Sequence, residues 1–390
     1  MRRSTWLAFT LVFGGVLLAL ACGGDSGGGP VTPKTLLAVA GDTQSGLTES
    51  QLPIPLRVRL LGSDGRRLAA ATVTWTVTAG TASLGAVSSV TDDTGSASAT
   101  VTLGVAPGQS TIQAAVTSIP AVTFKATACD YPPITLGGSI SGALTTTDCR
   151  FSGFYTDFYS LDLTSGQREV AITDSSSTFD TYLELYTFSG GIVGFNDDIQ
   201  PFVIPHSRID AILAAGTYLI SPSSYDTVVT GPYTVSAVTR AQGLANCDTV
   251  WVTRGVVVTD SVTTTDCGSS INGYYDIVAI VARQGSVLTI AQRSTAVNAR
   301  LRLLDFNGFQ VAVNDDSAAG NTNAFLVFTA PKLDVHYVLI GTSAPTETGA
   351  YTLAISSSTT LSQAAVAPGL PWRLTPSPAA SQRGWKRPMR

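Results

Sequence analysis

The sequence is short of charged residues, histidine and long helix-forming runs, and each shortage excludes a class of protein. Only 13% of its 390 residues are charged, compared with about 25% in an average soluble domain. Two histidines leave little room for His-rich metal sites or His-based catalysis. Runs rich in Leu, Glu, Lys and Ala are missing, which argues against coiled coils, helical bundles and helical repeats. Thr, Ser, Val, Ala and Gly dominate instead, a composition typical of strands and tight turns.

The net charge of −4 conceals an acidic folded part. Two arginines lie within the first three residues, and five of the last 20 residues are basic with no acid among them. Removing these seven from the 23 basic residues leaves 16 against 27 acidic residues, a net charge of −11. Such a surface repels phosphate backbones, so nucleic acid is not expected as a partner.

Residues 1–22 have the pattern of an export signal. Two arginines come first, and an apolar stretch from Trp6 to Leu20 follows, too short and too early for a typical membrane span. One interpretation is an ordinary signal peptide that is cut near Ala21, and the alternative is a lipoprotein signal. Export places the chain in an oxidising compartment, where disulfides form.

The end of this signal, residues 18–23, resembles the lipobox of bacterial lipoproteins, in which small residues precede a cysteine that becomes lipidated. The cysteine here is Cys22, and Ala19 stands where the family pattern prefers Leu. The resemblance implies that a lipid on Cys22 anchors the protein to a membrane, at the outer membrane or cell surface or on its periplasmic face. The glycine-rich residues 23–34 fit a flexible tether.

Four further cysteines fall into two pairs, each 20 positions apart: Cys129 with Cys149, and Cys247 with Cys267. In an exported protein this spacing predicts two local disulfides. Each would close a loop of about 20 residues and stabilise the fold by ~3 kcal/mol in the chain-entropy model. A four-cysteine zinc site is the alternative, but no Cys-x-x-Cys spacing supports it.

The spacing of the cysteines belongs to a longer internal repeat. Four motifs recur 118 residues apart: Thr-Thr-Thr-Asp-Cys at 145–149 and 263–267, Leu-x-Leu at 183–185 and 301–303, Asn-Asp-Asp at 196–198 and 314–316, and Gly-x-Tyr-Thr at 231–234 and 349–352. Two copies of one domain explain this, residues 129–245 and residues 246–356. Short alternating runs separated by turn residues predict strands of a sandwich or jelly roll in each copy.

The order of motifs in each copy resembles the bacterial pre-peptidase C-terminal (PPC) domain. The first copy carries Asp-Phe-Tyr at 157–159, Phe-Asp-Thr-Tyr-Leu-Glu-Leu at 179–185, Asn-Asp-Asp at 196–198, Ala-Gly-Thr-Tyr at 215–218 and Gly-Pro-Tyr-Thr-Val at 231–235. The second copy is more diverged, with Asn298 in place of Asp180. The resemblance implies non-catalytic β-sandwiches that accompany secreted peptidases and other exported proteins and are implicated in binding surfaces or polymers.

Residues 35–128 show a different sequence pattern. Apolar and polar residues alternate strictly at 56–60 and 73–78, and Trp75 is the expected core anchor. The motifs resemble the bacterial Ig-like domain of group 1, the invasin/intimin type. They are Gly-Asp-Thr-Gln-Ser-Gly at 41–46, Val-Thr-Trp at 73–75, Thr-Asp-Asp-Thr-Gly-Ser-Ala at 91–97 and Leu-Gly at 103–104. The resemblance implies a rod or spacer of a surface protein, in some members part of an adhesive surface.

The last segment, residues 357–390, loses the alternation and contains five prolines among Ser, Ala and Arg. This composition predicts disorder. Contact between the basic tail and an anionic lipid or polysaccharide is the alternative.

No cofactor is required, but clustered Asp and Asn side chains in both copies could bind calcium. Ca²⁺ takes six to eight oxygen ligands, and the candidates are Asp180, Asn196, Asp197 and Asp198 in the first copy and Asn314, Asp315 and Asp316 in the second. The alternative is a turn in which Asn and Asp bond their own backbone. Adjacent carboxylates cannot flank a sugar bond from opposite sides, so glycosidase chemistry is excluded for them.

Surface aromatics could bind glycans by stacking, and Tyr155, Tyr274 and Tyr275 are the candidates. No motif for a nucleophile, a zinc protease or a phosphate loop is present. His206 lies in a loop-like stretch and His336 on an expected strand, and neither has a counterpart in the other copy. We therefore expect no enzyme.

Together these features predict an all-β protein of tandem sandwiches, one Ig-like and two PPC-like. The expected function is that of a non-catalytic envelope or surface lipoprotein in adhesion or binding, with an extracellular glycan or protein as ligand. The Ig-like module would be the spacer and the repeats the binding modules. Two alternatives are an architectural periplasmic component and an accessory subunit of a secreted peptidase.

Overall fold

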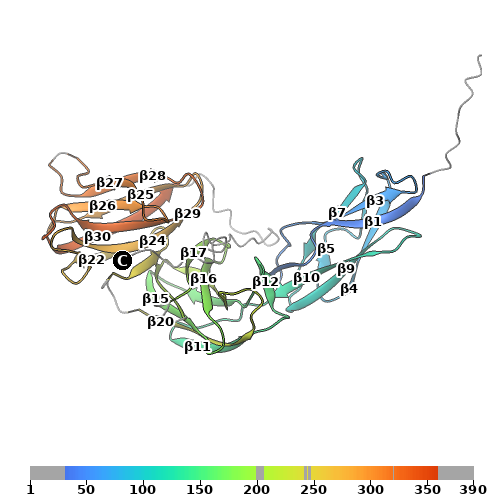
Figure 1. Ribbon diagram of the computed structural model, residues 1–390, viewed down its shortest axis with the longest axis horizontal. Helices are drawn as coiled ribbons and strands as arrows, with labels where there is room; N and C mark the ends of the chain where they lie inside the picture. The colour runs from blue at the N-terminus through green and yellow to red at the C-terminus, as the bar shows by residue number, and fades with distance from the viewer. Residues whose placement is uncertain (1–30, 199–205, 241–243, 245–246, 319, 359–390) are drawn as a thin grey trace, which may run out of the picture.

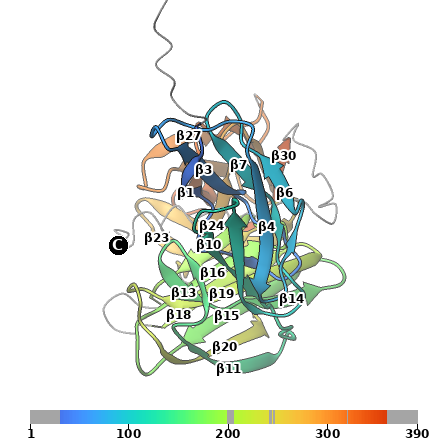
Figure 2. The same cartoon turned by 90° about the vertical axis from the view of Figure 1, so that its right-hand side faces the viewer.

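The computed structural model describes residues 31–198, 206–240, 244, 247–318 and 320–358, and this part of the chain contains strands and no helix. No segment that could cross a membrane as a helix is found there. The strands form three groups along the long axis of the molecule, blue at one end, green in the middle and orange at the other (Figure 1). Figure 2 views the molecule from the amino-terminal end, with the first group in front. The prediction of an all-β fold of tandem sandwiches is confirmed.

The amino-terminal unit is a sandwich of a three-stranded and a five-stranded sheet, ordered β1-β3-β7 and β2-β10-β9-β4-β6, with a small β5-β8 pair. Its strands are β1 (Pro33–Ala40), β2 (Gln44–Leu47), β3 (Leu56–Gly62), β4 (Thr72–Ala79), β5 (Ser83–Leu84), β6 (Ser88–Val90), β7 (Ser96–Ala99), β8 (Val101–Thr102), β9 (Gly108–Ala115) and β10 (Val122–Cys129).

Trp75 is the core anchor of this unit, as predicted. Its side chain is 1% exposed on β4 and packs against Phe124 of β10, with ring centroids 6.0 Å apart. The indole N–H donates to the Ser89 hydroxyl over 2.8 Å, so the buried polar atom is satisfied. Val73 shares this face, because side chains two apart on a strand point the same way.

The first PPC-like copy also folds as two sheets. Its strands are β11 (Gly138–Leu144), β12 (Cys149–Phe151), β13 (Phe154–Thr156), β14 (Tyr159–Leu163), β15 (Arg168–Ser175), β16 (Thr181–Thr187), β17 (Ile192–Asn196), β18 (Ser207–Leu213), β19 (Gly216–Ser224) and β20 (Gly231–Thr239). One sheet has the order β12-β13-β19-β16-β17, with β14 also paired to β19, and the other contains β11-β20-β15-β18.

The second copy repeats most of this plan. It contains β21 (Thr249–Val252), β22 (Val257–Val262), β23 (Cys267–Ser269), β24 (Gly273–Ala282), β25 (Val287–Arg293), β26 (Ala299–Leu304), β27 (Gln310–Asn314), β28 (Ala324–Thr329), β29 (Asp334–Thr342) and β30 (Gly349–Ser358). The order β22-β30-β25-β28 corresponds to β11-β20-β15-β18 of the first copy, and β24-β29-β26-β27 corresponds to β14-β19-β16-β17.

The two copies are joined into one ten-stranded sheet by β21. This short strand runs parallel to β18 of the first copy, where Trp251 pairs with Ala211, and parallel to β24 of the second, where Trp251 pairs with Ala279. The Trp251 ring packs against Phe195 at 5.2 Å between centroids. It also covers Gly194, where an added Cβ would lie 2.6 Å from the indole, so a bare backbone is needed there.

The two copies also share a hydrophobic core. Strand β29 of the second copy is buried along its whole length, and β24 along most of it. One face of these strands, including Val338 and Ile340, belongs to the core of the second copy. The other face, including Ile277 and Leu339, belongs to the core of the first. The repeat in the sequence therefore does not correspond to two separately packed bodies.

Both predicted disulfides are present. Cys129 ends β10 of the amino-terminal unit and is bonded to Cys149 at the start of β12. Cys247, just before β21, is bonded to Cys267 at the start of β23. Each disulfide therefore fixes the segment that enters a PPC-like copy to the first hairpin of that copy.

Candidate functional site

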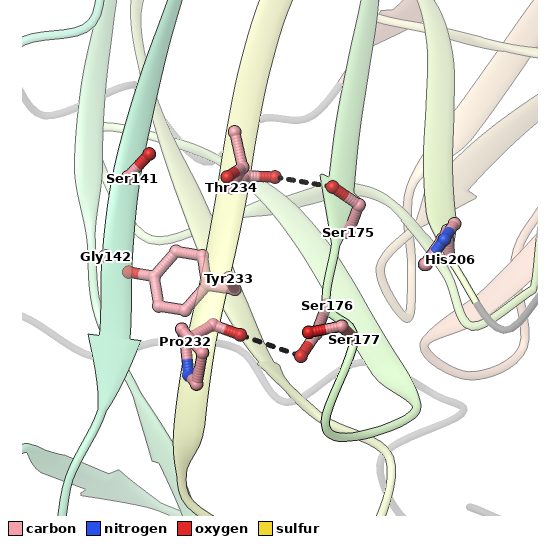
Figure 3. Close-up of a pocket in the computed structure, with 9 residues that line it drawn as sticks. All are labelled: Ser141, Gly142, Ser175, Ser176, Ser177, His206, Pro232, Tyr233 and Thr234. Carbon is pink, nitrogen blue, oxygen red and sulfur yellow. Dashed lines mark hydrogen bonds between the residues drawn. The ribbon is translucent and has the colours of Figure 1, made fainter.

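A surface hollow of about 410 Å³ opens on the first PPC-like copy. It is lined by residues of β11, β15 and β20, by the turn after β15 and by the residue before β18 (Figure 3). Among the residues that the structure describes, the lining contains no Asp, Glu, Lys or Arg and is rich in hydroxyl groups. Its residues are Ser141, Gly142, Ser175, Ser176, Ser177, His206, Pro232, Tyr233 and Thr234.

One wall of the hollow is set by a serine turn after β15. The hydroxyl of Ser176 donates to the carbonyl of Pro232 on β20 over 2.7 Å and accepts from the backbone N–H of Thr178 over 3.1 Å. This short-range bonding is typical of serine in turns. The side chains of Ser141 and Ser177 are exposed and make no hydrogen bond within the described part of the chain, so their hydroxyls are available to a ligand.

Tyr233 lies at the base of the hollow, but its hydroxyl is already committed. The O–H donates to Asp157 Oδ2 over 2.6 Å, and the Tyr159 hydroxyl lies 2.7 Å from it. Burial raises the pKa of Asp157 to about 6. The Tyr233 ring lies so close to Gly142 that an added Cβ there would come within 2.5 Å of it. The missing side chain at Gly142 therefore leaves room for the Tyr233 ring against β11.

His206 is the feature that distinguishes the two copies at this place. Two equivalent hydrogen bonds align β18 with β28: Arg208 N–H donates to Asn196 Oδ1 over 3.0 Å, and Phe325 N–H donates to Asn314 Oδ1 over 2.8 Å. In this alignment Asn323 occupies the position of His206.

Asn323 is bonded in the second copy, because its Oδ1 accepts from the Ser294 N–H over 2.9 Å. The Nδ1 atom of His206 is buried and has no partner among the described residues. Most buried polar groups in proteins are hydrogen-bonded, so this nitrogen calls for an explanation.

The arrangement suits binding of an uncharged polar ligand. The exposed hydroxyls of Ser141 and Ser177 can exchange hydrogen bonds with a sugar or a peptide, and the described lining offers no charge to pair with an ionic ligand. No hydrogen bond joins His206 to a serine in the part of the chain that is described.

The residues predicted to bind calcium have backbone-bonding roles in both copies. The Asn196 and Asn314 side chains accept the strand hydrogen bonds given above, and the Ser207 hydroxyl donates to the Asp197 carbonyl over 3.1 Å. Asp198 is 8% exposed. Asn314 Nδ2 donates to the carbonyl of Asp316 over 3.0 Å. These bonds fit the turn alternative.

Asp180 is partly buried immediately before β16, and its carbonyl accepts from the Tyr225 N–H over 2.8 Å. Asp315 is exposed. No group of three or more His, Cys, Asp or Glu side chains that could hold a metal ion is found among the described residues. Calcium binding therefore stays a prediction that these contacts do not support.

The three predicted glycan-stacking tyrosines lie apart from the hollow. Tyr155 on β13 has the Arg150 guanidinium over its ring, 5.5 Å from the centroid. Tyr274 and Tyr275 are successive residues of β24 and point to opposite faces, Tyr274 towards the core of the second copy and Tyr275 towards that of the first. Their packing favours a structural role, and glycan stacking on them stays a prediction.

The hollow has no single signature in the sequence. A signal existed in the three consecutive serines at 175–177, but the lining comes from segments up to 93 residues apart, from Ser141 to Thr234. Only the fold shows that these segments meet. The predicted lipidation site Cys22, the signal at 1–22 and most of the tail at 357–390 lie outside the described residues.

Comparison with known proteins gives similarity in structure alone. No family model matches this chain, and no curated protein does. A solved pre-peptidase C-terminal domain of a collagenase from Bacillus anthracis is 18% identical, with a TM-score of 0.23, covering 28% of this chain and 95% of that one. The D0-D1 domain of intimin is 14% identical, with a TM-score of 0.21, covering 53% and 99%.

Invasin, described as a bacterial integrin-binding protein, is 13% identical, with a TM-score of 0.22. The match covers 83% of this chain and 57% of invasin. The molecule is thus an all-β protein of tandem sandwiches whose structural neighbours include PPC and intimin/invasin-type domains. The low TM-scores mean that these similarities assign no function.

Proposed function

We propose that this protein is a non-catalytic binding protein of the cell envelope that holds an uncharged polar ligand, a glycan or a peptide, in the hollow of its first PPC-like copy. The observation that carries the proposal is the hollow itself, which is lined by the exposed serines Ser141 and Ser177 and by His206, whose buried Nδ1 has no partner among the described residues. In the second copy the aligned residue Asn323 is hydrogen-bonded to Ser294. A buried imidazole nitrogen without a partner calls for an explanation, and a ligand bound in the hollow would supply one.

The rest of the molecule supports a role outside the cytoplasm. Two disulfides are typical of exported proteins. The amino-terminal sandwich lies at one end of the elongated molecule (Figure 1), as expected for a spacer between an anchor and the binding modules. In this proposal a lipid on Cys22 holds the amino terminus at a membrane, and the repeated sandwiches face the ligand.

The proposal is tested by filling the hollow. Purified protein is screened against an array of glycans and surface peptides, and the best ligand is then measured by titration calorimetry. We expect Ser141→Trp, which places an indole in the hollow, to abolish binding. Ser141 is exposed, so the substitution leaves the core intact.

The matched control is Thr259→Trp, an equally exposed position 118 residues on, in the second copy. We expect this variant to bind like the wild type. Binding that survives Ser141→Trp, or that is lost equally in Thr259→Trp, would show that the hollow is not the ligand site. Hydrolysis of a ligand that is abolished by His206→Ala would overturn the non-catalytic part of the proposal.

A further inference from the structure

The second PPC-like copy ends in an uncovered apolar edge. Strands β27 and β28 are the outermost strands of its two sheets and lie next to one another, each paired on one side only, β27 with β26 and β28 with β25. Five large apolar side chains on this edge are between 42% and 70% exposed. We call them the distal apolar edge: Phe309, Val311, Val313, Phe325 and Val327.

The corresponding edge of the first copy is an interface. There β17 and β18 are covered by β21 and β24 of the second copy, and β18 gains a hydrogen-bonded neighbour. Val193, the counterpart of Val311, is 5% exposed, and Phe195, the counterpart of Val313, packs against Trp251. An edge of this type is therefore covered once within the molecule, and what covers it is another copy of the same domain.

The distal apolar edge also lacks the charges that its counterpart carries. Arg208 and Asp210 form an ion pair at 2.9 Å on β18. The aligned positions on β28 are Phe325 and Val327. Neither β27 nor β28 contains a charged residue. Natural edge strands commonly carry charges that prevent pairing with another chain, so an uncharged apolar edge favours association.

The structure points to a second copy of this chain as the occupant. We propose that two molecules associate through their distal apolar edges, β28 beside β28 in antiparallel register, to form a two-fold symmetric dimer. Such an interface is self-complementary and closes on itself. It also gives each edge the backbone partners it lacks.

Head-to-tail growth is disfavoured by the chain itself. The segment of the first copy that corresponds to β21 contains Pro132 and Pro133. Two parallel bridges establish this correspondence, because Pro133 pairs with Ser160 in the first copy as Trp251 pairs with Ala279 in the second. Proline has no N–H to donate to a neighbouring strand. A second molecule therefore cannot repeat the β18–β21 contact with this segment, which leaves edge-to-edge pairing.

The position of the edge gives the dimer a defined shape. Strands β27 and β28 lie at the end of the molecule opposite β1 and β3 (Figure 1). Pairing at this end places the two amino-terminal sandwiches at opposite ends of the dimer. The inference goes beyond the proposed ligand site, because none of the edge residues lines the hollow.

Sedimentation equilibrium of the purified chain tests the dimer. We expect concentration-dependent dimerisation of the wild type. We expect the double variant Phe325→Arg/Val327→Asp to be monomeric, with a dissociation constant raised at least roughly tenfold. This variant restores the ion pair that β18 carries, so the strand can accept both side chains, and circular dichroism would confirm that it is folded.

The control is Val87→Arg/Val90→Asp, which places the same two charges on exposed valines of the amino-terminal unit. We expect this variant to dimerise like the wild type. A wild type that is monomeric at every concentration, or a dimer that survives Phe325→Arg/Val327→Asp, would overturn the inference. The monomeric variant should still bind the ligand of the hollow, so the two proposals fail independently.

Discussion

Tyr351 donates a hydrogen bond to Asp276 over 2.8 Å, and both side chains are buried. The same bond joins Tyr233 to Asp157 over 2.6 Å in the first copy. The first bond connects the short segment between β13 and β14 to β20, and the second connects β24 to β30, each across about 75 residues of chain. The pair is therefore a repeated structural element of both copies, and the first one supports the base of the hollow.

Removing the donor of this pair should destabilise the fold. In Tyr351→Phe the ring remains, but Asp276 loses its partner in a buried site, which costs about 1–3 kcal/mol. Chemical denaturation at pH 7 measures the free energy of unfolding. Tyr274→Phe, on a tyrosine for which no hydrogen bond is found in the described chain, is the control and should change it little. An equal change in the free energy of unfolding for the two variants would show that the bond between Tyr351 and Asp276 does not stabilise the fold.

Asp276 should make stability depend on pH. Burial raises its pKa to about 8, and Tyr351 opposes the shift by donating to it. Since the folded state holds the proton more tightly than the unfolded state, the contribution of Asp276 is complete below about pH 4 and is lost as the pH rises through 8. Asp157, with its pKa raised to about 6, acts in the same direction at lower pH.

The measurement is the unfolding free energy at pH 5 and pH 9 for the wild type and Asp276→Asn. The amide can still accept from Tyr351 and cannot ionise. We expect the difference in stability between the two pH values to be smaller in the variant. An unchanged difference would mean that Asp276 is not a buried protonated acid near neutral pH.

The two PPC-like copies should unfold together. Ile277 and Leu339 of the second copy lie in the core of the first, so separating the copies would expose this face to water. We expect one cooperative calorimetric transition for residues 129–358. A fragment of residues 247–358 alone should aggregate, and residues 31–128 alone should remain soluble. Two independent transitions for the pair would contradict the shared core.

Gly194 should be intolerant of a side chain. An alanine Cβ would lie 2.6 Å from the Trp251 ring, and overpacking of this kind costs about 1–3 kcal/mol. The second copy already has Ala312 at this position, and it is not covered by a tryptophan there. Ala312→Gly is therefore the matched control, with a much smaller effect expected. Thermal unfolding measures the stability of both variants. A Gly194→Ala variant as stable as the wild type would contradict the placement of Trp251.

Local pattern predicted much of this fold. Alternation identified Trp75 as core, the 20-residue spacing predicted both disulfides, and the 118-residue repeat aligned Tyr233 with Tyr351. Each of these rests on short-range spacing or on comparing the chain with itself. Predictions of lipidation at Cys22 and of ligand contacts depend on partners outside the described chain, and they stay predictions.

The relation between the copies could not be predicted in this way. The strand at Thr249–Val252 joins two sheets by parallel pairing, which leaves no local pattern. One signal was present: Ile277 to Ala282 is an uninterrupted apolar run, and such runs are typical of strands buried on both faces. It indicated a covered strand without showing that the first copy covers it.

Protease treatment of intact cells, followed by mass spectrometry of the released peptides, tests the central claim most directly, because a surface binding protein must present its repeated sandwiches outside the cell. We predict peptides from residues 129–356 without lysis. Release of these peptides only after the outer membrane is opened would contradict a surface role and would favour a periplasmic one.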